Sequence, residues 1–137
     1  MMKSPEAVLR HALVTSTASA SILGARVYPI LAPSTAAMPF ATYRRAGIRR
    51  QQTLSGPMGV PQVTVEVDVY ATTYEGARLA ADCCRLVLDG YGGTVDNTEV
   101  KHVSLENEQD DFVQLAGAEM PPVYSVKQTY DVWWQET

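Results

Sequence analysis

The clearest pattern in the chain runs from Gln62 to Gly90. Four valines, from Val63 to Val69, alternate with polar residues, so one side of this segment is apolar and the other is polar. Because successive side chains point to opposite sides of a strand, the alternation predicts a strand with one buried face. The other face carries Glu66 and Asp68 and is expected to be solvated.

Apolar residues at helical spacing follow directly, between Ala77 and Leu88. Thr72 and Glu75 match a capping box, in which the threonine oxygen accepts a backbone amide proton and the glutamate reaches back to the cap. Gly90 suits the left-handed conformation that ends many helices. The strand and the helix each have one apolar face, so we expect them to pack together.

The remaining patterns predict a second helix and three further main strands. The helix begins at Ser4-Pro5-Glu6, where a capping serine precedes a proline and an acid. The strands follow Pro39, run from Val100 to Leu105, and close the chain from Tyr124 to Trp134. The fold class predicted is α+β, a mainly antiparallel sheet of about four strands with two helices packed on one face. We expect a single domain over 1–137.

Composition narrows the possible function. The chain has 137 residues, 46% of them hydrophobic, and a net charge of -4. No apolar run approaches the roughly 20 residues that a membrane span needs, and no signal peptide is recognisable, so we expect synthesis in the cytoplasm and no membrane partner. The acidic balance argues against a dedicated nucleic-acid binder, although it permits brief, non-specific contact with DNA.

No constellation of residues predicts an enzyme, a metal site or a cofactor. His11 and His102 have no ligand-type neighbour at metal-binding spacing, and no nucleotide-binding glycine motif is present. Cys83 and Cys84 are adjacent in the predicted helix and are read as small core residues. Glu66 and Asp68 could form a carboxylate pair for acid–base chemistry, but a solvated strand face is the favoured interpretation.

Two clusters of opposite charge are candidate interaction surfaces. Each could also be a solvated turn or hairpin end, and in a self-assembling protein the two could meet across a subunit boundary. The basic cluster adjoins a long hairpin loop, Gln51 to Pro61, that could itself be an assembly surface. The candidate interface residues are the basic Arg44, Arg45, Arg49 and Arg50, the loop residues Gln51, Leu54 and Met58, the strand residues Glu66 and Asp68, and the acidic Glu106, Glu108, Asp110 and Asp111.

The order of these features resembles the tail terminator or tail completion family of long-tailed bacteriophages and gene transfer agents. The similar segments lie in family order along nearly the whole chain, and Gln109 to Pro122 departs from the pattern. The segments are Gly24 to Pro29, Met38 to Tyr43, Val65 to Ala71, Thr73 to Ala80, Leu88 to Gly90, Tyr124 to Val126 and Tyr130 to Trp134.

The resemblance implies a structural virion protein and no catalysis. Such subunits form a ring, usually of six, that caps the tail tube at its head-proximal end and stops tube growth. The implied partners are further copies of the chain, the tail tube protein and a head–tail connector or stopper protein, with DNA passing through the lumen. The alternative left open is a small ligand-binding or regulatory α+β module, which would need an apolar pocket with convergent polar groups.

Overall fold

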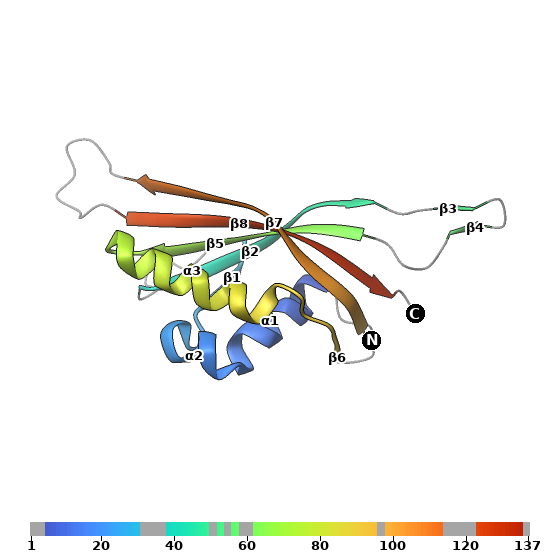
Figure 1. The fold of residues 1–137 in the computed structure, drawn as a ribbon, viewed down its shortest axis with the longest axis horizontal. Coiled ribbons are helices and arrows are strands. Elements are labelled where there is room, and N and C mark those ends of the chain that lie inside the picture. Colours follow the sequence, from blue (N-terminus) through green and yellow to red (C-terminus); the bar gives the residue numbers. More distant parts are fainter. Residues whose placement is uncertain are drawn as a thin grey trace.

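The computed structural model places three helices on one side of a long sheet (Figure 1). It describes residues 5–30, 38–49, 52–53, 56–57, 62–95, 98–113 and 123–135. Within these residues the helices are α1 (Pro5–Thr15), α2 (Thr17–Leu23) and α3 (Tyr74–Leu88). The strands are β1 (Val27–Pro29), β2 (Phe40–Arg49), β3 (Gln52–Thr53), β4 (Gly56–Pro57), β5 (Gln62–Ala71), β6 (Gly93–Val95), β7 (Thr98–Val113) and β8 (Val123–Gln135).

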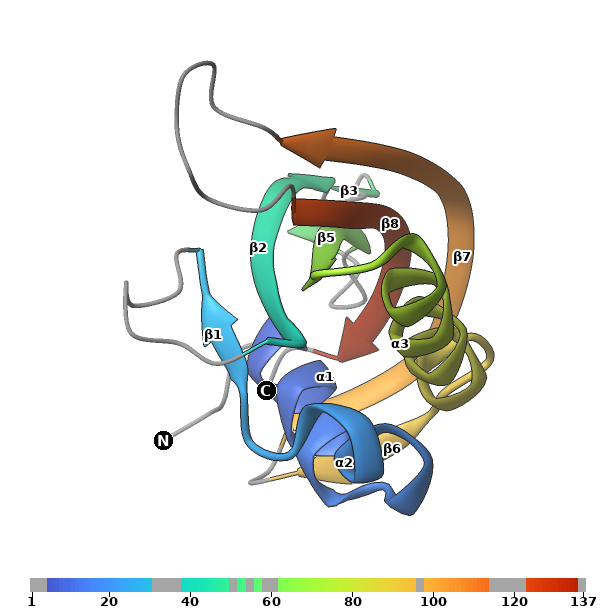
Figure 2. The same ribbon diagram turned by 90° about the vertical axis from the view of Figure 1, so that its left-hand side faces the viewer.

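The main sheet has six strands in the order β1-β2-β5-β8-β7-β6, and β3 and β4 form a separate small ribbon. β1 runs parallel to β2, while the other neighbours in the main sheet are antiparallel. Helix α1 contacts both β2 and β7, which are not neighbours in the sheet, because the sheet curls around it. Figure 2 shows this half-barrel-like curl from one end.

The predicted fold class, about four strands with two helices on one face, is therefore wrong. The protein is built mainly on a curled, mixed sheet, and its helices are small by comparison. β1 and β6 have only three residues each, too few for a hydrophobic period to be recognised. β1 ends in Pro29 and lies at the sheet edge, where a proline, which has no backbone N–H, is tolerated.

The core lies between the helices and one face of the sheet. Val63, Val65, Val67 and Val69 are completely buried, which confirms the predicted alternation in β5. Ala77, Ala80 and Ala81 of α3 are also completely buried. These short side chains let the helix backbone lie close to the sheet, where dispersion contacts are strongest.

The cap of α3 lies one residue later than the sequence predicted. Thr73, not Thr72, is the N-cap, and its Oγ1 accepts the backbone N–H of Gly76 at 3.0 Å. A Cβ on Gly76 would come within 2.9 Å of that oxygen, so the glycine makes room for the cap. At the other end, Gly90 has φ +81°, the left-handed conformation predicted for it.

Candidate functional site

The face of the sheet opposite the helices is polar, and we call it the open face. Val67 of β5 pairs with Gln128 of β8 on the helix side, so the alternate residues of each strand point to the other side. The open face includes Arg44 on β2, Glu66, Asp68 and Tyr70 on β5, Ser125, Lys127 and Thr129 on β8, and Asn107, Gln109 and Asp111 on β7.

Strand alternation divides the basic cluster between the two faces. Arg44 lies on the open face, where its Nη2 donates to both carboxylate oxygens of Glu66 at 3.1 Å. Arg45 points to the helix side and forms an ion pair with Glu6 of α1 at 3.1 Å. Arg49 ends β2 in register with Gln62. The two arginines that the structure describes in full are thus paired within the chain.

The acidic cluster is divided in the same way. A solvated turn was one interpretation of the sequence, but Glu106 to Asp111 lie inside β7, which pairs with β8 from Asn107 to Asp111. Glu108 and Asp110 face α3, where Arg78 reaches their carboxylates at 2.8 and 3.2 Å. Asp111 points to the open face, and Glu106 lies at an irregularity in the β7–β8 register.

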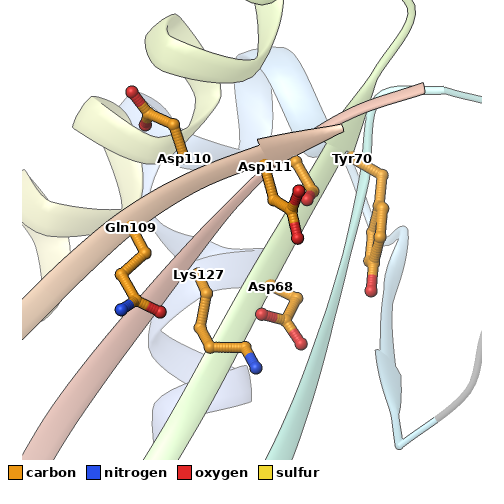
Figure 3. Close-up of a pocket in the computed structure, with 7 residues that line it drawn as sticks. Asp68, Tyr70, Gln109, Asp110, Asp111 and Lys127 are labelled. Carbon is orange, nitrogen blue, oxygen red and sulfur yellow. The ribbon is translucent and has the colours of Figure 1, made fainter. Parts of the chain in front are cut away.

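A depression of about 640 Å³ lies on the open face, lined by Asp68, Tyr70, Gln109, Asp110, Asp111, Ser125 and Lys127. Figure 3 shows Asp110 turned to the opposite side of β7 from Gln109 and Asp111, and Lys127 extended toward Asp68. Small-molecule sites are usually lined by apolar and aromatic side chains. This mainly charged and polar lining does not favour the alternative of a ligand-binding module.

Asp68 is an open-face carboxyl whose surroundings raise its pKa. Partial burial between neighbouring strands raises its pKa, while Lys127 opposes the shift, Glu66 adds to it and Arg44 opposes it. Glu66 has closer cationic partners, since Lys127 Nζ lies 3.5 Å from it and Arg44 lies at 3.1 Å. The two carboxyls sit side by side on β5 with different environments.

Replacing Asp68 with asparagine should therefore stabilise the protein at pH 7. A carboxyl with a raised pKa in the folded state binds more protons than in the unfolded state. Folding stability then falls as the pH rises from the ordinary carboxyl pKa through the raised one. Urea unfolding at pH 7 and pH 3 should show the gain at pH 7 and its loss at pH 3. Glu66→Gln is the matched control and should be destabilising at pH 7, since it removes a paired charge.

A buried polar network joins β8 to α3, and little in the sequence indicates it. Gln128 is completely buried and interrupts the apolar face of β8. Its Nε2 donates to the Ala81 carbonyl at 2.8 Å and to Glu108 at 2.7 Å, and its Oε1 accepts the Tyr130 hydroxyl at 2.6 Å. A lone glutamine at an apolar position was visible in the sequence, but its partners lie in other elements.

The remaining predicted interface residues, Arg50, Gln51, Leu54 and Met58, lie outside the described residues, as does the side chain of Arg49. Cys84 is buried, which raises its thiol pKa to about 12, and Cys83 is half-buried. Both cysteines are free. Among the described residues, no three His, Cys, Asp or Glu side chains gather as metal ligands, and no helix is long and apolar enough to span a bilayer.

Comparison with known proteins agrees with the resemblance seen in the sequence. The sequence profile of the family described as "Tail completion protein gp17" matches residues 7–133. No curated protein sequence matches. Among solved structures, a chain of one described as "Virion of native gene transfer agent (GTA) particle" has the same fold, with a TM-score of 0.78 at 12% identity. The alignment covers 97% of this chain and 96% of that one.

Proposed function

Because this chain belongs to the tail completion protein gp17 family, we propose that it forms the ring that completes a phage-type tail. Family membership makes it a structural component of the virion tail. The proposal adds that about six copies form a ring. This ring caps the tail tube at the head-proximal end, ends its polymerisation and meets the head connector or stopper protein. Assembly would take place in the host cytoplasm.

The observation that carries the proposal is the one-sided arrangement of the sheet. Helices α1 and α3 both pack on the valine face, so the open face has a polar surface available to a lumen or to another protein. A soluble subunit with one covered face and one polar face can line a water-filled channel without exposing its core. The catalytic and ligand-binding alternatives find no comparable support among the described residues.

We propose that the open face lines the lumen of this ring. Glu66, Asp68, Asp111 and Asp131 lie on it, and the described cations there are Arg44 and Lys127. Among the described side chains of this face, four carboxylates therefore outnumber two cations, an acidic excess. Such a surface repels the phosphate backbone, so DNA could pass without being retained.

We propose that the charged clusters contact other subunits or partner proteins, with the change that some of their charges already have partners inside the chain. Arg44 and Glu108 have partners inside the chain, so each can join a contact only by sharing its charge or exchanging that partner. Arg49 ends the β2 strand at the base of the loop, and together with Arg50 it is proposed to contact the tube or a neighbouring subunit. The loop residues Gln51, Leu54 and Met58 belong to the same proposed surface.

Removing the chain from the producing host should give tails of abnormal length that fail to join heads, as seen by negative-stain electron microscopy. Supplying the wild-type chain should restore normal tails. The double variant Arg49→Glu/Arg50→Glu should not restore them, because it reverses the charge of the proposed contact surface. Normal joined tails without the chain would contradict the proposed function. Full rescue by the double variant would contradict only the role of these arginines.

A further inference from the structure

The edge of the subunit at β1 presents an isoleucine in an unusual conformation. Ile30 follows β1 directly, its φ is +64°, and 74% of its surface is exposed. A β-branched residue in the left-handed region is strained, and strain of this kind is retained where the residue serves a function. The Ile30 N–H donates to the Tyr43 carbonyl at 2.8 Å, which holds the backbone in place. The conformation of Ile30 therefore lowers the stability of the fold, and it leaves an apolar side chain exposed at the surface.

The surroundings of Ile30 are basic. A depression of about 470 Å³ beside it is lined by Glu6, Pro29, Ile30, Tyr43, Arg44 and Arg45. The side chains of Arg44 and Arg45 have exposed fractions of 51% and 37%, so both remain accessible although each has an internal partner. The β1 edge therefore combines one exposed apolar anchor with accessible positive charge.

Helix α3 carries the complementary combination on the other side of the subunit. Leu79 and Leu86 are 57% and 68% exposed and lie two turns apart, with the half-buried Cys83 between them. Around the N-terminal half of this stripe, the carboxylates of Glu75, Asp82, Glu108 and Asp110 outnumber the guanidinium of Arg78. An apolar stripe with an acidic border therefore runs along the outer side of α3.

These two surfaces are on opposite sides of the molecule. In Figure 2, β1 lies at the left and α3 at the right, and the sheet order places β1 at one edge while α3 packs on β5 and β8. A ring is closed by heterologous contacts, in which one patch of each subunit meets a different patch of the next. Two apolar surfaces with borders of opposite charge, one on each side, meet that requirement.

We propose that Ile30 of one subunit packs on the Leu79–Leu86 stripe of the next copy of this chain. Arg44 and Arg45 of the first subunit then face the acidic border of α3 in the second. This inference rests on the proposed function, since it names the contact that closes the ring. It assigns the contact to the β1 edge and the outer side of α3, neither of which was predicted from the charge clusters alone.

Substitution of Ile30 with asparagine distinguishes a role of this residue in subunit assembly from a role in folding. Asparagine adopts positive φ more readily than isoleucine, so the melting temperature of the purified chain should be unchanged or higher. Loss of one buried isoleucine should weaken subunit association about ten-fold to a hundred-fold, measured as reduced incorporation into purified tails. A clear fall in melting temperature, or normal incorporation, would show that Ile30 is not an assembly anchor.

Cross-linking tests the pairing of the two surfaces directly. The variant Ile30→Cys, incorporated into tails and oxidised, should form disulfides with Cys83 of the neighbouring copy. Each chain then holds one accessible cysteine on either side, because Cys84 is buried. A heterologous contact should therefore give a ladder of covalent oligomers beyond the dimer. The ladder should vanish in Ile30→Cys/Cys83→Ser. The wild type and Asn107→Cys, whose new thiol is exposed on the open face, should give none.

The outcomes separate this contact from the proposed function. Dimers alone from Ile30→Cys would indicate a symmetric contact and overturn the pairing. Tails that contain the variant but show no cross-linked bands would also overturn it, while the chain would remain a tail completion subunit. If the wild-type chain were absent from purified tails, both the contact and the proposed function would be wrong.

Discussion

Replacing Gln128 with leucine should lower the free energy of unfolding by about 2–4 kcal/mol, even though an apolar side chain is the usual choice at a completely buried position. Leucine has a similar size and would complete the apolar pattern of β8. It would, however, leave the Tyr130 hydroxyl without its acceptor. Glu108 and the Ala81 carbonyl would each lose the bond from Gln128, although Glu108 keeps its ion pair with Arg78. An unsatisfied buried polar group loses its hydration with no compensating bond. Urea unfolding at pH 7 measures the difference.

A double-mutant cycle with Tyr130→Phe identifies the cause. In the wild type, removing the Tyr130 hydroxyl should cost about 1 kcal/mol, because Gln128 then loses a hydrogen bond. In the Gln128→Leu background the same change should be close to neutral or stabilising, because the hydroxyl no longer has an acceptor to lose. If Gln128→Leu is as stable as the wild type, the network does not contribute to folding as we infer.

Reversing the charge of Arg78 should destabilise the protein by about 2 kcal/mol, a figure that allows for partial solvent exposure. The guanidinium of Arg78 lies 2.8, 3.2 and 3.2 Å from the carboxylates of Glu108, Asp110 and Asp82. Its hydrogen bond to Glu108 is the main cause of its raised pKa. Glutamate at position 78 would place a further negative charge among these carboxylates. The loss should shrink as salt is added, because screening weakens repulsion between charges near the surface.

Arg85→Glu is the matched control, since it reverses an arginine in the last turn of the same helix. We expect a smaller loss, about 0.5–1 kcal/mol, from the less favourable interaction with the helix dipole. Thermal melts of both variants at low and high salt compare the two effects. Equal losses for Arg78→Glu and Arg85→Glu would show that the acidic side of β7 does not depend on Arg78.

The partners of the acidic run explain why the sequence alone suggested a turn there. Glutamate, asparagine and aspartate have low strand propensity, so Glu106 to Asp111 looked like a turn. The run is a strand because β8 supplies backbone partners from Asn107 to Asp111. Arg78 and Tyr74 of α3 neutralise or bind the two carboxylates that face inward. Both kinds of partner come from distant parts of the chain, and no local pattern contains them.

The same limitation applies to the charge clusters as candidate surfaces. Runs such as Arg44-Arg45 look continuous in the sequence, yet alternation sends neighbouring side chains to opposite faces. Arg44 therefore meets Glu66 on the open face, and Arg45 meets Glu6 beside α1. The alternation could have been applied from the sequence for β2. The partners could not, because they depend on how the strand and helix are placed in space.

By itself, the sequence determined the valine strand, the helix after it, the general position of its caps and the family to which the chain belongs. Each of these depends on local periodicity or on the order of short motifs. Only the tertiary structure decided the six-stranded curl, the parallel β1, the internal partners of the charges and the outward position of Ile30. These features come from pairing between segments far apart in the chain, whose free energy depends on geometry that residue order does not contain.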